Sequence, residues 1–308
     1  MYDMMRKWWV IAVPVLLCSH KGIAQRYDTT TVFSAPVSLD AYVIKSGFDV
    51  NAFIRRVRND TTFYKAFRSM RLLSYNAVND IKVYDKHGGL AAKEYSRTRQ
   101  EMVMGCRSTN VLERKTTGDF YDRKGGYNYY TAELFAYLFF TQGTICNEND
   151  IVAGTMNDYG KGQMEKRKYE LKQLIFNPGS AIRGIPFMSD RESIFDVAEA
   201  GKYDFAITLQ QYDGEACYVF KITPKDGYKR KVIYNNVTTW FRKSDYSIVA
   251  RDYSLSYHTM VYDFDVIMKV RTKQVNNKLL PTYISYDGDW HVFTKKRERV
   301  KFSSVIGY

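Results

Sequence analysis

Residues 248–270 read IVARDYSLSYHTMVYDFDVIMKV, and this stretch decides the fold. In its second half every other residue is apolar, and polar residues occupy most of the positions between them. Alternation with a period of two places the apolar side chains on one face of a β-strand and leaves the other face to water. The apolar face of this predicted strand consists of Tyr262, Phe264, Val266, Met268 and Val270.

The same pattern extends outward from this stretch in both directions. Strand-like alternation fills residues 203–308, and a second run of it fills residues 73–130. Hairpin turns are predicted at Lys243–Asp245, Asn276–Asn277 and Asp287–Gly288, because these residue types favour tight turns. The composition of 26 Tyr, 18 Phe and 6 Pro favours long strands as well. We therefore expect an α+β fold built on one large curved antiparallel sheet, a half-open barrel.

Helical segments are predicted to pack on the concave side of this sheet. Asp49 is a candidate N-cap, and residues 49–70 read as one broken helix or two short ones. Residues 131–140 are apolar almost all round, which predicts a buried helix with Thr131 as its N-cap. Residues 162–176 form an amphipathic pattern, and we expect this helix at the mouth of the barrel.

The first 24 residues read as a secretory signal peptide. Arg6 and Lys7 precede an apolar segment, and small residues ahead of Gln25 form a cleavage site. The apolar segment is about half of the roughly 20 residues that span a bilayer, so we expect cleavage rather than retention. The predicted organisation is a signal peptide over 1–24, a leader with a first short strand over 25–48 (the strand at Ala41–Ile44), and a single α+β domain over 49–308.

Three cysteines remain after this cleavage, namely Cys106, Cys146 and Cys217. Export to an oxidising compartment permits one internal disulfide and leaves one thiol. Three pairings are compatible with the sequence. We favour Cys106 with Cys146, and the alternative is three buried reduced thiols.

The chain is basic, with a formal net charge of +13. A basic exported protein is attracted to anionic surfaces such as phospholipid head groups. The basic segment 295–301 could contribute to this attraction, or it could be a solvated edge strand guarded by lysine. An anionic membrane surface is therefore an expected partner. Nucleic acid is not, because export separates the protein from it.

Few side chains in the sequence suggest catalysis or metal binding. Asp263 and Asp265 share one strand face and Asp287 lies in a predicted turn, so these carboxylates could serve a glycan-active hydrolase or bind calcium. The alternative interpretation is a solvent-facing strand side and an ordinary turn. The histidines lack metal-ligand spacing, and phosphate-loop and nucleophile-elbow motifs are absent from the sequence. We assign no catalytic residue, no metal site and no cofactor, and a non-enzymatic protein is favoured.

Residues 238–248, TTWFRKSDYSI, resemble a strand–turn–strand segment of the periplasmic lipoprotein-carrier superfamily (LolA/LolB-like). The order of leader, helix, strands, buried helix, helix and long C-terminal meander is similar as well. Residues 60–67 and 175–179 look like segments of exported proteins from Gram-negative envelopes. Carriers of this superfamily hold acyl chains under an incomplete barrel closed by helices. The resemblance therefore implies a concave apolar cavity in this chain.

These observations lead to a hypothesis of non-enzymatic binding. The ligand would be an apolar or amphipathic molecule of the envelope, a lipid or a lipoprotein acyl chain, held between the sheet and the helices. The protein is expected in the periplasm or at the outer membrane of a Gram-negative bacterium. The alternatives are a glycan-active hydrolase and a structural or adhesion module of the envelope. The expected lining of the ligand cavity is Phe135, Leu138, Phe139, Tyr262, Phe264 and Met268.

Overall fold

The computed structural model describes residues 33, 35–40, 43–44, 47–141, 143–147, 176, 178–179, 193–258, 262–292 and 296–308. The chain divides into two units, residues 1–32 and 33–308, and every described residue belongs to the second. The predicted signal peptide 1–24 and the predicted helix 162–176, apart from Phe176, lie outside the described residues. None of the helices in the described ranges combines the length and hydropathy that a membrane-spanning segment requires.

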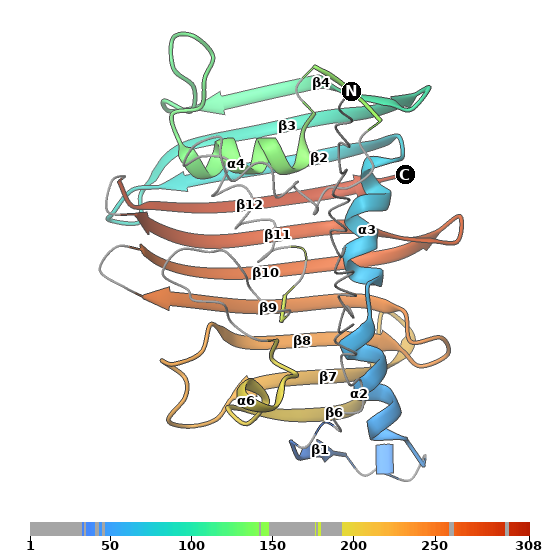
Figure 1. Cartoon of the computed structure of the whole chain (residues 1–308). Coiled ribbons are helices and arrows are strands. Elements are labelled where there is room, and N and C mark those ends of the chain that lie inside the picture. Colours follow the sequence, from blue (N-terminus) through green and yellow to red (C-terminus); the bar gives the residue numbers. More distant parts are fainter. Residues whose placement is uncertain are drawn as a thin grey trace, which may run out of the picture. The chain divides into compact units, whose positions relative to one another are not determined.

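Within the described residues, twelve strands form a single curved sheet (Figure 1). Its strand order is β1-β6-β7-β8-β9-β10-β11-β12-β2-β3-β4-β5. Neighbouring strands are antiparallel, except that β1 runs parallel to β6. The predicted half-open barrel is therefore confirmed, with one short parallel strand added at its edge. The strands are β1 (Val37–Leu39), β2 (Tyr75–Tyr84), β3 (Leu90–Val103), β4 (Cys106–Thr117), β5 (Thr144–Cys146), β6 (Tyr203–Tyr212), β7 (Glu215–Pro224), β8 (Tyr234–Arg242), β9 (Ile248–His258), β10 (Tyr262–Val275), β11 (Lys278–Val292) and β12 (Glu298–Gly307).

The first strand lies earlier in the chain than the sequence suggested. It is β1 at Val37–Leu39, whereas Val43 and Ile44 are helical. The prediction of a strand at Ala41–Ile44 is therefore wrong. Its physical reason is Asp40, whose carboxylate accepts a hydrogen bond from the backbone N–H of Val43 at 2.9 Å. This side-chain cap starts a helical turn directly after β1.

Helices pack on the concave face of the sheet. In Figure 1, α2 (Val50–Asn59) and α3 (Thr62–Arg71) follow each other across the strands, and α4 (Tyr130–Phe139) contacts β12. A single-turn helix, α6 (Val197–Ala200), contacts β6. Asp49 accepts a hydrogen bond from the backbone N–H of Ala52 at 2.9 Å, which confirms the predicted N-cap of α2. Of the two alternatives for residues 49–70, one broken helix or two short ones, the structure shows two short helices.

The alternation that predicted the sheet also decides which side chains reach the core. On β10, Phe264, Met268 and Val270 are buried, whereas Asp265 and Ile267 are exposed. The same alternation continues on the neighbouring strands, so their apolar side chains form one core with those of the helices. A register slip of one residue would turn this apolar set toward solvent.

Asp287 and Gly288 do not form the predicted turn, because they lie inside β11. A Cβ atom at residue 288 would lie 2.0 Å from the hydroxyl oxygen of Tyr286. Glycine is therefore needed here so that the ring of Tyr286 can lie across its own strand. The turn before β11 forms as predicted at Asn276 and Asn277, which both have positive φ (48° and 61°).

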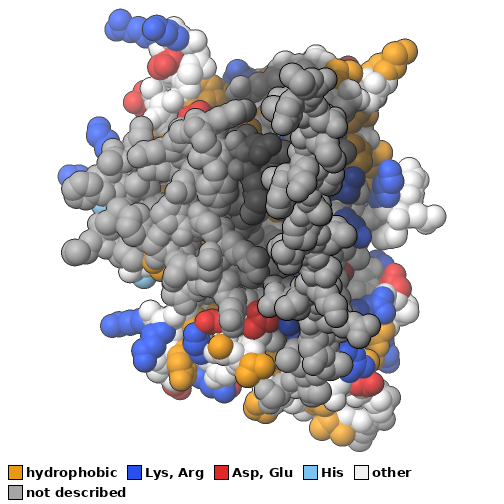
Figure 2. Space-filling model, viewed as in Figure 1, with side chains coloured by type: hydrophobic (Ala, Val, Ile, Leu, Met, Phe, Trp, Pro, Cys, Tyr) orange, Lys and Arg blue, Asp and Glu red, His pale blue; other side chains and the backbone are white. Residues whose placement is uncertain are grey.

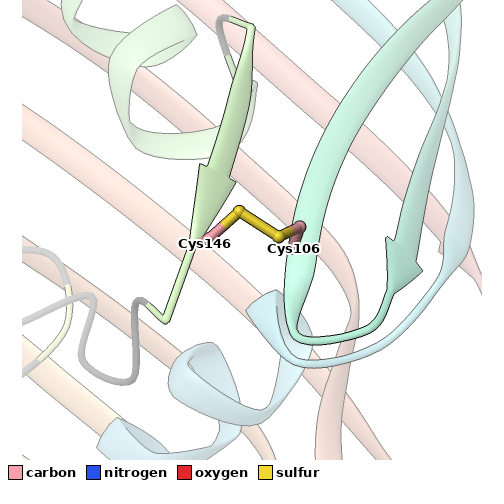
Figure 3. The surroundings of a disulfide bond; sticks show 2 residues. All are labelled: Cys106 and Cys146. Atoms are coloured by element: carbon pink, nitrogen blue, oxygen red, sulfur yellow. A yellow bond between two sulfur atoms is a disulfide. The ribbon is translucent and has the colours of Figure 1, made fainter.

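A disulfide joins Cys106 at the start of β4 to Cys146 at the end of β5 (Figure 3). The two cysteines are direct partners in the antiparallel register, and their Cα atoms are 3.9 Å apart. The bond closes a segment of 40 residues that contains α4. Cys217 is free and buried. The favoured pairing is therefore confirmed.

Replacing both bridging cysteines by serine is expected to lower the free energy of unfolding by about 2–4 kcal/mol, because the unfolded chain regains the freedom of the closed loop. Denaturant titration followed by tryptophan fluorescence measures this change. Adding reductant should destabilise the wild-type protein to the same degree and leave the double variant unaffected. Equal stability of the oxidised and reduced wild-type proteins would contradict the expectation.

Candidate functional site

A continuous row of aromatic side chains crosses the concave face from β10 to α4. The ring of Phe264 stacks on Trp290 with 4.8 Å between centroids, and Trp290 Nε1 donates a hydrogen bond to the hydroxyl of Tyr286. Tyr286 meets Phe135 of α4 edge-on at 4.5 Å, and Phe135 stacks on Phe302 of β12 at 4.8 Å. We call these five buried residues the aromatic row.

Five of the six predicted lining residues lie in the same apolar layer. Two of these five are on β10 and three are on α4, and the aromatic row connects the two groups through Tyr286 and Trp290. Tyr262 begins β10, but its side chain lies outside the described residues. The buried members of the predicted lining are Phe135, Leu138, Phe139, Phe264 and Met268.

Tyr286, Trp290 and Phe302 are members of this layer that the sequence analysis missed. Placing a turn at Asp287–Gly288 hid the alternation of β11, in which residues 286, 288 and 290 share one face. Continuing the period of two through the glycine would have revealed Tyr286 and Trp290, whereas Phe302 lies on β12. Burial raises the pKa of Tyr286 well above its ordinary value, so its hydroxyl stays neutral and accepts the hydrogen bond from the indole.

The amino-terminal end of α4 is capped by a residue from β12. The prediction of Thr131 as the N-cap is wrong, because the helix begins at Tyr130 and the side chain of Tyr129, at the N-cap position, makes no hydrogen bond that caps the helix. The carboxylate of Glu298 instead accepts hydrogen bonds from the backbone N–H groups of Tyr130 (2.9 Å) and Thr131 (2.8 Å). A carboxylate at this place satisfies two free donors and interacts favourably with the helix dipole.

The carboxyl-terminal end of α4 is held by an arginine of α3. Arg71 Nη2 donates hydrogen bonds to the carbonyl oxygens of Leu138 (2.6 Å) and Tyr137 (3.4 Å) in the last turn of the helix. A positive charge is favourable at this end of a helix. Charged side chains from two other elements therefore fix α4 to the concave face.

A buried polar network lies beside α4. The side-chain amide of Asn79 on β2 donates to Thr98 Oγ1 at 3.1 Å, and the hydroxyl of Ser304 donates to Asn79 Oδ1 at 2.8 Å. These residues and Phe139 line a cavity of about 10 Å³. Such a volume holds about one water molecule. An acyl chain therefore does not fit at this point while α4 is in place.

The candidate catalytic carboxylates lie on the opposite, solvent-facing side of the sheet. Asp263 is ion-paired with Arg297 at 2.5 Å, and Asp287 is ion-paired with a lysine of β12 at 2.8 Å. Nδ1 of His258 lies 3.2 Å from Oδ1 of Asp263, and its Nε2 lies 3.4 Å from Oδ1 of Asp265. Asp263 and Asp287 are therefore paired with cations on this side of the sheet, and the aromatic row contains none of the three carboxylates.

Glu298→Gln is expected to loosen α4. The neutral amide keeps one acceptor oxygen but loses the attraction to the helix dipole, so stability should fall by about 1 kcal/mol. Hydrogen exchange of the backbone amides of residues 130–139 should accelerate, while the amides of β9 and β10 stay protected. Glu113→Gln is the control, since Glu113 pairs with Lys115 on β4, away from the helix. Equal exchange of α4 in both variants would show that Glu298 does not hold it.

No protein family matches the chain, and no curated protein matches it. Two solved structures are similar over most of its length. One is described as an outer membrane lipoprotein-sorting protein domain from Vibrio parahaemolyticus, with 11% sequence identity, a TM-score of 0.25 and coverage of 79% of this chain and 90% of that chain. The other is a DUF1329 family protein from Desulfovibrio piger, with 12% identity, a TM-score of 0.21 and coverage of 80% and 90%.

Proposed function

We propose that this protein binds an apolar or amphipathic ligand of the cell envelope, a lipid or a lipoprotein acyl chain, on the concave face of its sheet. The proposed role is non-enzymatic. The observation that carries the proposal is the aromatic row, which joins β10, β11, β12 and α4 into one apolar surface. Ligand sites are lined mainly by such apolar and aromatic side chains, whereas catalysis requires convergent polar groups around a reacting atom.

The proposed lining consists of the aromatic row together with Leu138, Phe139, Tyr262 and Met268. Each methylene group that moves from water to such a surface contributes roughly 0.8 kcal/mol. A chain of about ten methylenes therefore offers roughly 8 kcal/mol, before the cost of ordering the ligand is subtracted. This contribution must exceed the free energy of the α4 contacts that the ligand replaces.

Ligand binding in this proposal requires α4 to move. The cavity beside Phe139 is too small for a chain, so the ligand would replace the contacts that α4 makes with Phe302 and Tyr286. Polar side chains hold α4 at its two ends, and these hydrogen bonds can break without disturbing the sheet. The disulfide at Cys146 would keep the segment after α4 attached to β4.

The proposed location is the periplasm or the outer membrane of a Gram-negative bacterium. The disulfide between Cys106 and Cys146 supports export, because disulfides persist in oxidising compartments. An anionic membrane surface fits the net charge of +13. Figure 2 shows Lys and Arg side chains around the periphery of the face that carries the helices. Electrostatic attraction to anionic lipid would concentrate the protein where its ligand resides.

Adding oleate to the delipidated protein is expected to change the fluorescence of Trp290, because an acyl chain in the aromatic row would contact its indole. Trp290→Phe should abolish most of this change. Trp240→Phe should retain it, since Trp240 lies on the opposite face of the sheet beside Tyr212 and Arg271. Native mass spectrometry should show the added mass of the ligand on the wild-type protein.

Two neighbouring residues of β10 provide a matched pair of variants for the same measurement. Met268→Glu places a charge on the buried face and should weaken oleate binding by at least about tenfold. Ile267→Glu places the same charge on the exposed face and should leave binding unchanged, because 49% of Ile267 is already exposed. A folded, delipidated protein that takes up no oleate by either measurement would overturn the proposed function.

A further inference from the structure

Arg251 is a buried charge on the apolar concave face. It lies on β9, and its register partners are Thr239 on β8 and Val270 on β10. Only 8% of the residue is exposed to solvent. Burying a guanidinium group is costly unless its donors are bound, so a buried arginine normally has a full set of partners.

The partners of Arg251 satisfy only part of its guanidinium group. Its Nε donates to Thr239 Oγ1 at 3.0 Å, and the guanidinium carbon lies 4.4 Å from the ring centroid of Phe63 on α3. Among the described residues, no hydrogen bond or ion pair engages the terminal nitrogens Nη1 and Nη2. These two nitrogens form a planar pair of donors that matches a carboxylate or a phosphate.

Asp60, at the junction of α2 and α3, is the carboxylate whose charge acts on Arg251. Its Oδ1 accepts a hydrogen bond from the backbone N–H of Thr62 at 3.0 Å, whereas its Oδ2 is buried and has no partner in the described structure. The described contacts include no ion pair between Asp60 and Arg251, for which the oxygen and the nitrogen would have to lie within 4.0 Å of each other. Burial lowers the pKa of Arg251 to about 10, so the group stays charged at neutral pH.

The position of Arg251 relative to the aromatic row fits an elongated ligand. Its partner Val270 is separated by six residues on β10 from Phe264, the first member of the row. At roughly 3.3 Å per residue this separation is about 20 Å. An extended long-chain acyl group spans such a length, with its head group at Arg251 and its chain end at the row.

We propose that Arg251 binds the oxyanion head group of the ligand, a carboxylate or a phosphate, while the chain lies along the concave face toward Trp290. This inference rests on the proposed function and names its ligand class, the anionic single-chain amphiphiles. The head group supplies the acceptors that Nη1 and Nη2 lack. Asp60 competes with it, because two anions close to one guanidinium repel each other.

The test compares three probes that share one chain and differ in the head group: oleate, oleyl phosphate and oleyl alcohol. The wild-type protein should bind the two anions at least about tenfold more tightly than the alcohol, as hydrogen bonds to a charged group are strong. A preference for one anion over the other assigns the head group to a fatty acid or to a phosphate ester. Titration followed by Trp290 fluorescence measures all three affinities.

Four variants separate the role of the charge from a general effect on the fold. Arg251→Met should bind all three probes with the affinity that the wild type has for the alcohol. Arg251→Lys should keep part of the preference for anions, and Asp60→Asn should raise it several-fold because the competing charge is removed. Arg99→Met is the matched control, since Arg99 is exposed and pairs with Glu101 on β3. It should behave as the wild type.

The orientation of the ligand provides a second measurement. Fatty acids brominated near the chain end should quench Trp290, whereas those brominated next to the carboxylate should not. Equal wild-type affinity for oleate and oleyl alcohol, or an anion preference that survives in Arg251→Met, would overturn the head-group assignment. In both cases the proposed function stands, because the chain still binds. Failure of all three probes to bind would instead overturn the proposed function together with the inference.

Discussion

The antiparallel pairing of β12 with β2 is the contact on which the rest of the structure depends. It joins the strands β6–β12 to the strands β2–β5, so that one sheet instead of two carries the concave face. Ser304 and Asn79 meet across this pairing, although 225 residues separate them in the chain. Their buried hydrogen bond favours one register, because a slip of one residue would leave both polar groups unpaired and would turn apolar side chains to solvent.

The buried and half-buried charges on the concave face differ in how completely they are satisfied. Glu298 and Arg71 bond to backbone groups of α4, where each also complements an end of the helix dipole. These two charges therefore stabilise the fold. Within the described part of the chain, Arg251 has one hydrogen bond and one ring contact, and we propose that its remaining donors bind the head group of the ligand. The apolar side chains of this face belong both to the hydrophobic core and to the proposed binding surface. In the proposal, they form the core while α4 is in place and bind the ligand when α4 moves.

The sequence by itself determined the local elements of the fold. The period of two identified β9 and β10, Asp49 marked the start of α2, and Asn276–Asn277 marked a turn. These features depend on neighbouring residues in the chain, so composition and spacing are sufficient to predict them. The burial of the proposed lining residues on α4 and β10 was predictable for the same reason, since burial follows from the apolar face of each element.

Only the tertiary structure decided the features that depend on residues far apart in the chain. The sequence indicates a turn at Gly288, but the residue is a glycine because the ring of Tyr286 occupies the place where a Cβ atom would lie. The cap of α4 comes from Glu298, which is 168 residues away from Tyr130, so no local pattern could indicate it. In the sequence, Arg251 is a single charged residue within an alternating strand. Its burial follows from the packing of Phe63 of α3 against it, which the sequence of the strand does not indicate. Local propensity depends on residues that are neighbours in the chain. The cap of α4, the packing around Gly288 and the desolvation of Arg251 depend instead on segments that are distant in the chain and become adjacent only in the folded structure.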